Sequence, residues 1–367
     1  SSDLSTIQLE VRGCTMTRKN ALFPAIALAT AALITPQTSH ALNFIFNEIG
    51  NTPLDSRARA GFEEAGAIWS SLFSDDINVR IDIGFSTLGA GVLGQAGSAQ
   101  FVGSYDLIRS GLQNDITTGF DALAVSNLQN NSNLNVMIDG VASNAGNVNN
   151  NTMRVNSANL KALGLLGDVF SGQLITDAII QFNSDFNFDF DISDGINGFD
   201  FVGVALHEIG HALGFTSGVD IIDRNGFNPN TATATVLDLF RYTTESNDAG
   251  AVDWSPGGTP YFSLTGDALF LEGQQDTALF STGSFTGDGN QASHWKDNLG
   301  IGILDPTFSQ NEIGQISTFD LVALDAIGFD LILQQEPPGA GPTPTVPLPS
   351  SLSLSIIGLI GLRIMSK

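Results

Sequence analysis

Cysteine is almost absent from this chain of 367 residues. The single cysteine, Cys14, lies before a segment that we predict to be removed on export. Without a second thiol the chain has no intramolecular disulfide, and without Cys14 the mature form has no thiolate ligand for a metal. Its stability must therefore come from a hydrophobic core, for which 42% hydrophobic residues at this length suffice.

Basic residues are also scarce. Only 14 Lys and Arg stand against 38 Asp and Glu, which gives a formal net charge of −24. Such an acidic surface repels phosphate backbones and anionic lipid, so we expect no nucleic-acid partner. Long apolar runs are lacking too, because the runs at 21–34 and 350–362 are shorter than the roughly 20 residues of a spanning helix.

The N-terminal region has the order of a secretory signal peptide. Met16 begins a short basic stretch, an apolar run covers 21–34, and Ser39 and Ala41 supply the small residues that signal peptidase recognises. We therefore predict upstream sequence over 1–15, a signal peptide over 16–41 and an exported body over 42–335.

The C-terminal region combines a Pro/Gly-rich linker at 336–349, an apolar segment over 350–362, and two terminal basic residues, Arg363 and Lys367. This order resembles the PEP-CTERM sorting signals of exported proteins in Gram-negative bacteria, although Leu348 stands where that family usually has Glu. The resemblance implies a sorting peptidase that removes the tail (350–367), only transient membrane contact, and a final location outside the cell, either secreted or in the cell-surface matrix. A weak membrane anchor is the alternative.

The body mixes patterns typical of strands and helices. Its hydrophobic patterning predicts strands over 42–49, 77–85, 122–128 and 177–182, helices over 55–73, 105–116, 199–214 and 317–327, and a loop-rich stretch over 129–156. Strands followed by helices, and then a strand beside a long helix, indicate an α+β fold with a mixed sheet.

A run of alternating residues follows the strand expected at 177–182. Asp185, Asn187, Asp189 and Asp191 alternate with aromatic and aliphatic side chains. A half-buried strand with a solvated polar face explains this pattern, and calcium bound by the oxygen ligands is the alternative. Phe190 stands where an EF-hand loop needs Gly, so we favour the strand.

The motif that indicates chemistry is HEIGHALGF at 207–215. On a helix, the imidazoles of His207 and His211 lie one turn apart on one face, where both can bind a single metal ion. Glu208 follows the first histidine and is placed to act on a water without occupying the metal. Asp200 can cap the start of this helix, and Gly214 can end it.

A catalytic zinc site needs a third protein ligand. Once His40 is removed on export, His294 is the remaining histidine of the mature chain, and we predict that it is the third ligand. Asp220 and Glu245 are the alternatives, because carboxylates are the other available donors.

The motif HExxHxxG followed by a distant histidine resembles the metzincin clan of zinc peptidases. Most members place the third histidine where this chain has Ser217, so the closer resemblance is to the leishmanolysin-like branch, in which an insertion precedes a Ser-His-Trp sequence such as Ser293-His294-Trp295. Leu304 stands where that family has the methionine of a Met turn. The resemblance implies a twisted mixed sheet with a backing helix and an active-site helix, an irregular C-terminal subdomain, and an edge strand near 177–182 beside the cleft.

The leading hypothesis is a secreted zinc metalloendopeptidase that acts on a protein or peptide substrate, with His207, His211 and His294 as metal ligands and Glu208 as general base. The alternative is an exported extracellular-matrix or surface interaction protein with a degenerate, non-catalytic form of the fold. A zinc hydrolase with a non-peptide substrate is a third possibility.

Overall fold

A computed structural model describes residues 42–50, 53–144, 149–226, 233–269, 271 and 277–332. The upstream sequence, the predicted signal peptide, the linker at 336–349 and the C-terminal segment lie outside these residues. Within the described ranges, no helix combines the length and the apolar character needed to cross a membrane.

The described residues form a mixed α/β structure with eight α-helices and several small sheets, consistent with the predicted α+β class. The helices are α1 (Ser56–Ser70), α2 (Tyr105–Asn114), α3 (Gly119–Asn127), α4 (Ser157–Ala162), α5 (Phe201–Leu213), α6 (Val219–Arg224), α7 (Thr244–Asp248) and α8 (Thr318–Ala326). The strands are β1 (Asn43–Glu48), β2 (Asn78–Ser86), β3 (Gly94–Ser98), β4 (Gln100–Ser104), β5 (Val136–Ile138), β6 (Val141–Ser143), β7 (Thr152–Asn156), β8 (Val169–Phe170), β9 (Gln173–Leu174), β10 (Ala178–Asn183), β11 (Phe188–Asp189), β12 (Phe199–Asp200), β13 (Arg241–Tyr242), β14 (Val252–Asp253) and β15 (Tyr261–Phe262).

The largest sheet has the strand order β1-β2-β10-β3. Strands β1, β2 and β10 are parallel, and β3 is antiparallel to β10. The prediction that the strand near 177–182 lies at the edge is therefore wrong, because β3 occupies the edge. Sequence patterning missed β3 because its five residues, GQAGS, carry no alternation of large apolar side chains.

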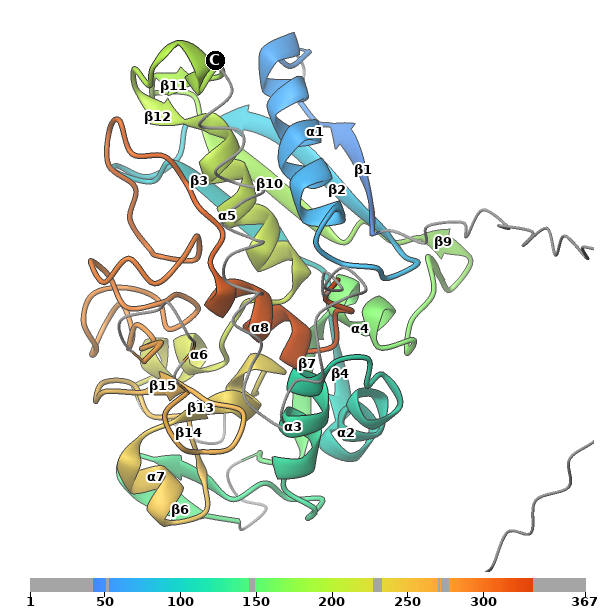
Figure 1. The fold of residues 1–367 in the computed structure, drawn as a ribbon, viewed down its shortest axis with the longest axis vertical. Coiled ribbons are helices and arrows are strands. Elements are labelled where there is room, and N and C mark those ends of the chain that lie inside the picture. Colours follow the sequence, from blue (N-terminus) through green and yellow to red (C-terminus); the bar gives the residue numbers. More distant parts are fainter. Residues whose placement is uncertain are drawn as a thin grey trace, which may run out of the picture. The chain divides into compact units, whose positions relative to one another are not determined.

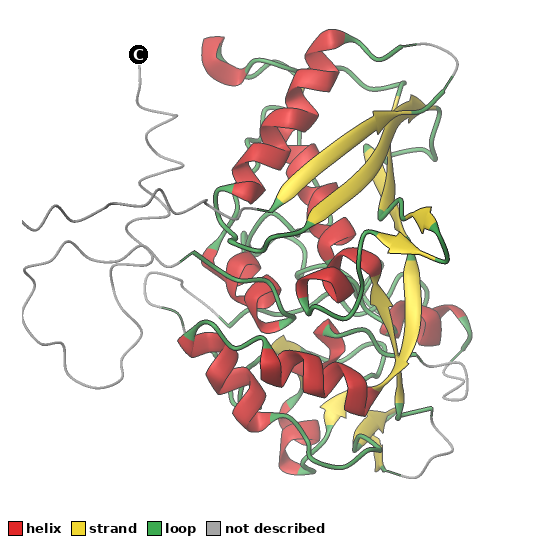
Figure 2. Ribbon diagram, turned by 90° about the vertical axis from the view of Figure 1, so that its right-hand side faces the viewer, coloured by secondary structure: helices red, strands yellow, loops and turns green. Residues whose placement is uncertain are grey.

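Helices α1 and α5 run side by side across one face of this sheet (Figure 1). In the view turned by 90°, the strands of the sheet lie together on one side of these helices (Figure 2). Phe62 of α1 and Phe201 of α5 meet Phe182 of β10, with ring centroids 5.0 and 4.6 Å from the Phe182 ring. Trp69 of α1 donates a hydrogen bond from Nε1 to the carbonyl of Leu206, 3.1 Å away. These contacts fix α5 immediately before its first histidine.

The two helices approach closely because α1 has a glycine at the crossing. A Cβ on Gly61 would lie 2.4 Å from Cδ1 of Phe201, whose ring is fully buried among other phenylalanines. A side chain at this position would therefore push the two helices apart, since neither the backbone nor the packed ring can move freely.

We predict that Gly61→Ala lowers the free energy of unfolding by about 1–3 kcal/mol through overpacking, although Ala is intrinsically the better helix former. The measurement is urea denaturation of the purified body. Gly119→Ala is the matched control, because a Cβ at this first residue of α3 meets no atom within 4 Å. An equal effect of the two substitutions would contradict the packing argument.

All four predicted helices are confirmed, but one predicted strand is wrong. Residues 122–128 lie in α3, which begins with a capping box in which Thr118 and Asp121 bond reciprocally to each other's backbone amides. Phe120 and Ala124, four residues apart, form its buried face. The stretch expected to be loop, 129–156, contributes β5, β6 and β7, and β7 pairs antiparallel with β4.

The acidic run forms a turn rather than a long strand. Only Phe188–Asp189 (β11) pairs, in parallel with β12. Beyond this pair, Asp189 accepts hydrogen bonds from the amides of Asp191 and Asn197, and Asp191 accepts one from Ser193. The carboxylates of Asp189 and Asp191 therefore accept hydrogen bonds from the amides of their own loop. The calcium alternative gains no support from this arrangement.

Candidate metal centre

Helix α5 presents His207 and His211 on one face. Asp200 stands at the N-cap, and its carboxylate accepts a hydrogen bond from the amide of Gly314 (3.1 Å) rather than from the first turn of the helix. Gly214 ends the helix with φ of 138°, a conformation that favours glycine, so the chain can turn sharply after the second histidine. The predicted boundaries of the motif helix are confirmed to within two residues at each end.

His294 comes from an irregular segment that the Trp295 side chain anchors. Trp295 is fully buried, stacks on Phe280 with centroids 5.0 Å apart, and donates a hydrogen bond from Nε1 to Asp320 of α8 (2.8 Å). The amide of Trp295 also donates to the carbonyl of Leu304 (2.9 Å). These contacts hold the neighbouring imidazole against α5.

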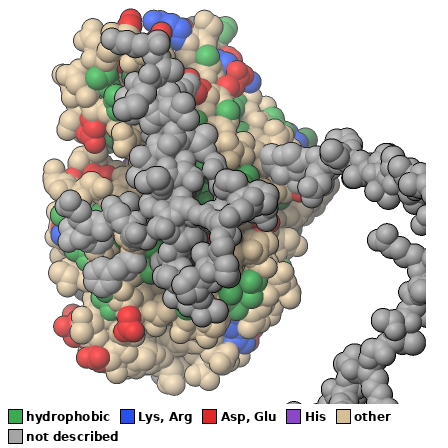
Figure 3. Space-filling view, in the orientation of Figure 1, with side chains coloured by type: hydrophobic (Ala, Val, Ile, Leu, Met, Phe, Trp, Pro, Cys, Tyr) green, Lys and Arg blue, Asp and Glu red, His purple; other side chains and the backbone are tan. Residues whose placement is uncertain are grey.

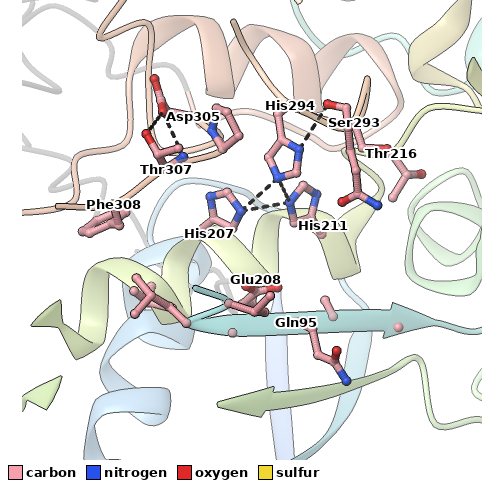
Figure 4. A pocket seen from close by; sticks show the side chains of 18 of the residues that line it. Gln95, His207, Glu208, His211, Thr216, Ser293, His294, Asp305, Thr307 and Phe308 are labelled. Atoms are coloured by element: carbon pink, nitrogen blue, oxygen red, sulfur yellow. Dashed lines mark hydrogen bonds between the residues drawn. The ribbon is translucent and has the colours of Figure 1, made fainter. Parts of the chain in front are cut away.

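The three histidines converge on one point, and their rings face one another in Figure 4. The Nε2 atom of His211 lies 3.0 Å from that of His207 and 3.1 Å from that of His294, and the third pair is 3.3 Å apart. A tetrahedral ion with bonds of about 2.0–2.1 Å to nitrogen sets its ligands about 3.3 Å apart. Together these side chains could bind a metal ion, and they are the only convergent group of three or more His, Cys, Asp or Glu among the described residues.

Backbone carbonyls fix which ring nitrogen carries the proton. The Nδ1 atoms of His207, His211 and His294 face the carbonyl oxygens of Ile303 (2.8 Å), Phe215 (2.7 Å) and Gln291 (3.3 Å). A carbonyl can only accept, so each Nδ1 is the protonated nitrogen of a neutral ring, and each Nε2 presents a lone pair. Three lone pairs that face one another repel unless a cation lies between them.

The site also disfavours protonated histidine. Burial lowers the pKa of His207 to about 3 and that of His211 to about 4, and burial together with the other two rings lowers the pKa of His294 well below its usual value. The imidazoles therefore stay neutral, and able to bind a metal, at pH values where ordinary histidines are charged.

The turn that contains Leu304 packs against α5 next to His207 and Gly210. Leu304 is fully buried, and a Cβ on Gly210 of α5 would lie 3.1 Å from its methyl groups. Asp320 of α8 is equally buried and accepts hydrogen bonds from the amides of Ile303 (2.9 Å) and Ser317 (2.6 Å) as well as from Trp295. Leu304 thus fills an apolar position under the helix. The sequence predicts Asp320 only as a capping-box partner of Ser317, and its contacts with the turn and with Trp295 were missed.

Glu208 lies on the sheet side of the site. In Figure 4 its side chain lies between α5 and the strand that carries Gln95, below the three histidines. A Cβ on Gly94 of β3 would lie 2.8 Å from the carboxylate oxygen Oε1, so this glycine provides the space that the side chain needs. Burial alone raises the pKa of Glu208 to about 8, and a neighbouring cation would oppose that shift.

The histidines and Glu208 lie in a cleft of about 980 Å³. One wall is β3 with the segment that precedes it, and the opposite wall comprises Asp305, Pro306, Thr307 and Phe308. No Lys or Arg lines it among the described residues. The two alternative ligands are not part of the convergent group: Asp220 accepts hydrogen bonds from Ala292 and Ser293, and Glu245 is exposed on α7.

No protein-family model, curated protein or solved structure matches this chain. The interpretation of the site therefore rests on its own geometry and chemistry.

We predict that zinc affinity depends only weakly on pH. Protons compete with the metal for the Nε2 lone pairs, so three imidazoles with an ordinary pKa of about 6.5 would weaken binding by about 50-fold between about pH 7.5 and about pH 6.0. Because burial lowers these pKa values, we expect a change of less than about twofold over the same interval. Competition with a chelator of known affinity measures the zinc affinity at each pH. A fall in this affinity by tens of fold would contradict a buried site with neutral imidazoles.

Proposed function

We propose that this chain is an exported zinc-dependent metalloendopeptidase, related to the metzincin clan and closest to its leishmanolysin-like branch. The observation that carries the proposal is the convergence of three Nε2 lone pairs beside a buried glutamate in an open cleft.

The donor set fits zinc. Three neutral imidazoles with tautomers fixed by carbonyls match a catalytic zinc site, which has three protein ligands and keeps one position open. The histidines line the cleft, which leaves the fourth ligand position open. Three imidazoles complete the protein ligands without a cysteine thiolate. A bound zinc ion supplies Lewis-acid chemistry, which makes water nucleophilic near neutral pH and polarises the scissile carbonyl.

Glu208 is suited to be the general base. It projects into the cleft from the same helix as two ligands but offset around the helix axis, so it can reach a water at the site without coordinating the metal. In this role the carboxylate accepts a proton from the attacking water and passes it to the leaving amine. Gly94 leaves room for this carboxylate between α5 and β3.

The edge of β3 is suited to bind an extended peptide. Strand β3 ends the sheet order, so on the cleft side its backbone amides and carbonyls have no sheet partner among the described strands. A substrate can add a strand there through main-chain hydrogen bonds, with alternate side chains directed into the cleft. This supports a peptide over a small-molecule substrate. A protein substrate of this chain must also tolerate its net charge of −24. In Figure 3, Asp and Glu side chains form separate groups, mainly near the margins of the face shown.

We predict that Glu208→Gln abolishes hydrolysis of casein or gelatin while zinc content stays near that of the wild type. Gln keeps the size of the side chain but cannot accept the proton, so the reaction loses its base and the metal keeps its ligands. A fluorogenic protease assay with parallel metal analysis measures both quantities. Wild-type activity in the variant would refute the mechanism. If the wild-type chain binds zinc but cleaves no protein, whether or not a chelator is present, the result would favour the exported interaction protein.

A further inference from the structure

The segment after α5 contains a buried cluster of polar side chains that the proposed chemistry does not use. Ser217 lies three residues beyond Gly214 and is 8% exposed. Its amide donates a hydrogen bond to Oγ of Ser293 (2.8 Å), although 76 residues separate the two along the chain. Ser293 directly precedes His294. The short turn after the motif helix therefore holds the segment that supplies the distant histidine.

Asp220, at the start of α6, makes a second connection to the same segment. Its Oδ1 accepts a hydrogen bond from the amide of Ala292 (2.6 Å), and its Oδ2 accepts one from Oγ of Ser293 (2.5 Å). One carboxylate thus fixes the two residues that lead into His294. Hydrogen bonds to an ionised carboxylate are shorter and stronger than neutral ones, so this contact can set the position of the backbone.

The turn itself is held from the opposite side. Asp238, 1% exposed, accepts hydrogen bonds from Oγ of Ser217 (2.5 Å) and from the amide of Gly218 (2.8 Å). The guanidinium of Arg241 is buried nearby, and its charge opposes the rise that burial causes in the pKa values of Asp220 and Asp238. Arg241 also donates to the carbonyl of Ser281, whose amide donates to the carbonyl of His294 (3.0 Å).

We propose that Asp220 and Ser293 are positioning residues for the third metal ligand. They bind the segment of His294 to the turn after α5 and so bring the Nε2 of His294 to those of His207 and His211. Asp220 acts through hydrogen bonds and does not coordinate the ion. The inference rests on the proposed metal site and deepens it, because it explains how a histidine 83 residues beyond His211 serves in place of a nearer one.

Helix α6 also carries a matched control for Asp220, namely Asp223. Asp223 is buried, and it accepts hydrogen bonds from the amides of Phe285 and Thr286, at 2.8 Å each. It stabilises a neighbouring loop, and in the described part of the chain its carboxylate has no hydrogen bond to residues 292–294. Asp223→Asn should therefore lower stability as Asp220→Asn does, without moving His294.

The experiment measures zinc affinity of the exported body by competition with a chromophoric chelator for the wild type, Asp220→Asn, Ser293→Ala and Asp223→Asn. Cobalt absorption spectra of each variant report ligand geometry. We expect zinc affinity to fall by about 10–100-fold in Asp220→Asn and Ser293→Ala, with a changed cobalt spectrum, because residues that orient metal ligands have effects of this size. Asp223→Asn should stay within about twofold of the wild type.

Two outcomes would overturn the inference. Wild-type affinity in both Asp220→Asn and Ser293→Ala would show that the contacts are only structural. An equal loss in Asp223→Asn would show a general effect of stability. Ser293→Ala keeps the test decisive if Asp220→Asn does not fold. A wild-type chain that binds no zinc would overturn the proposed function as well, whereas unchanged affinity in the variants of a zinc-binding chain overturns this inference alone.

Discussion

The structure depends on one electrostatic constraint: three imidazole nitrogens with their lone pairs directed at one another. Each ring donates a hydrogen bond from its Nδ1–H to a backbone carbonyl, so no Nε2–H remains to bridge the gaps of 3.0–3.3 Å. Burial disfavours protonation of the rings as a way to relieve the repulsion. A divalent cation would bind all three lone pairs at once, and for this reason we propose a metal ion between the three rings.

The surrounding fold serves to keep these rings in place. Helix α5 is fixed from below by the phenylalanine cluster that joins it to α1 and β10, and Gly61 lets the two helices approach. From the other side, Asp320 holds both Trp295 and the turn that supplies the Ile303 carbonyl. The candidate metal site is therefore assembled from two parts of the chain that are distant in sequence, and each part has its own buried hydrogen-bond network.

The sequence predicted the convergence of the three histidines better than it predicted their surroundings. The spacing of His207 and His211 and the scarcity of other histidines led to His294, because these signals depend on local helix geometry and on residue counts. The strand over 122–128 was wrong because a capping box at Thr118 outweighed an apolar run that could have been a strand. Strand β3 was missed because it is rich in glycine, although Gly94 makes room for Glu208. The role of Asp220 was also out of reach, since it depends on contacts with residues more than 70 positions away.

The decisive measurement is the metal content of the purified body for the wild type and for His294→Ala, determined by mass spectrometry after dialysis against a weak chelator. We expect about one zinc ion per chain in the wild type and almost none in the variant, because two imidazoles alone hold zinc too weakly to survive dialysis. Full zinc content in His294→Ala would contradict this expectation, since the site would then not depend on the distant histidine.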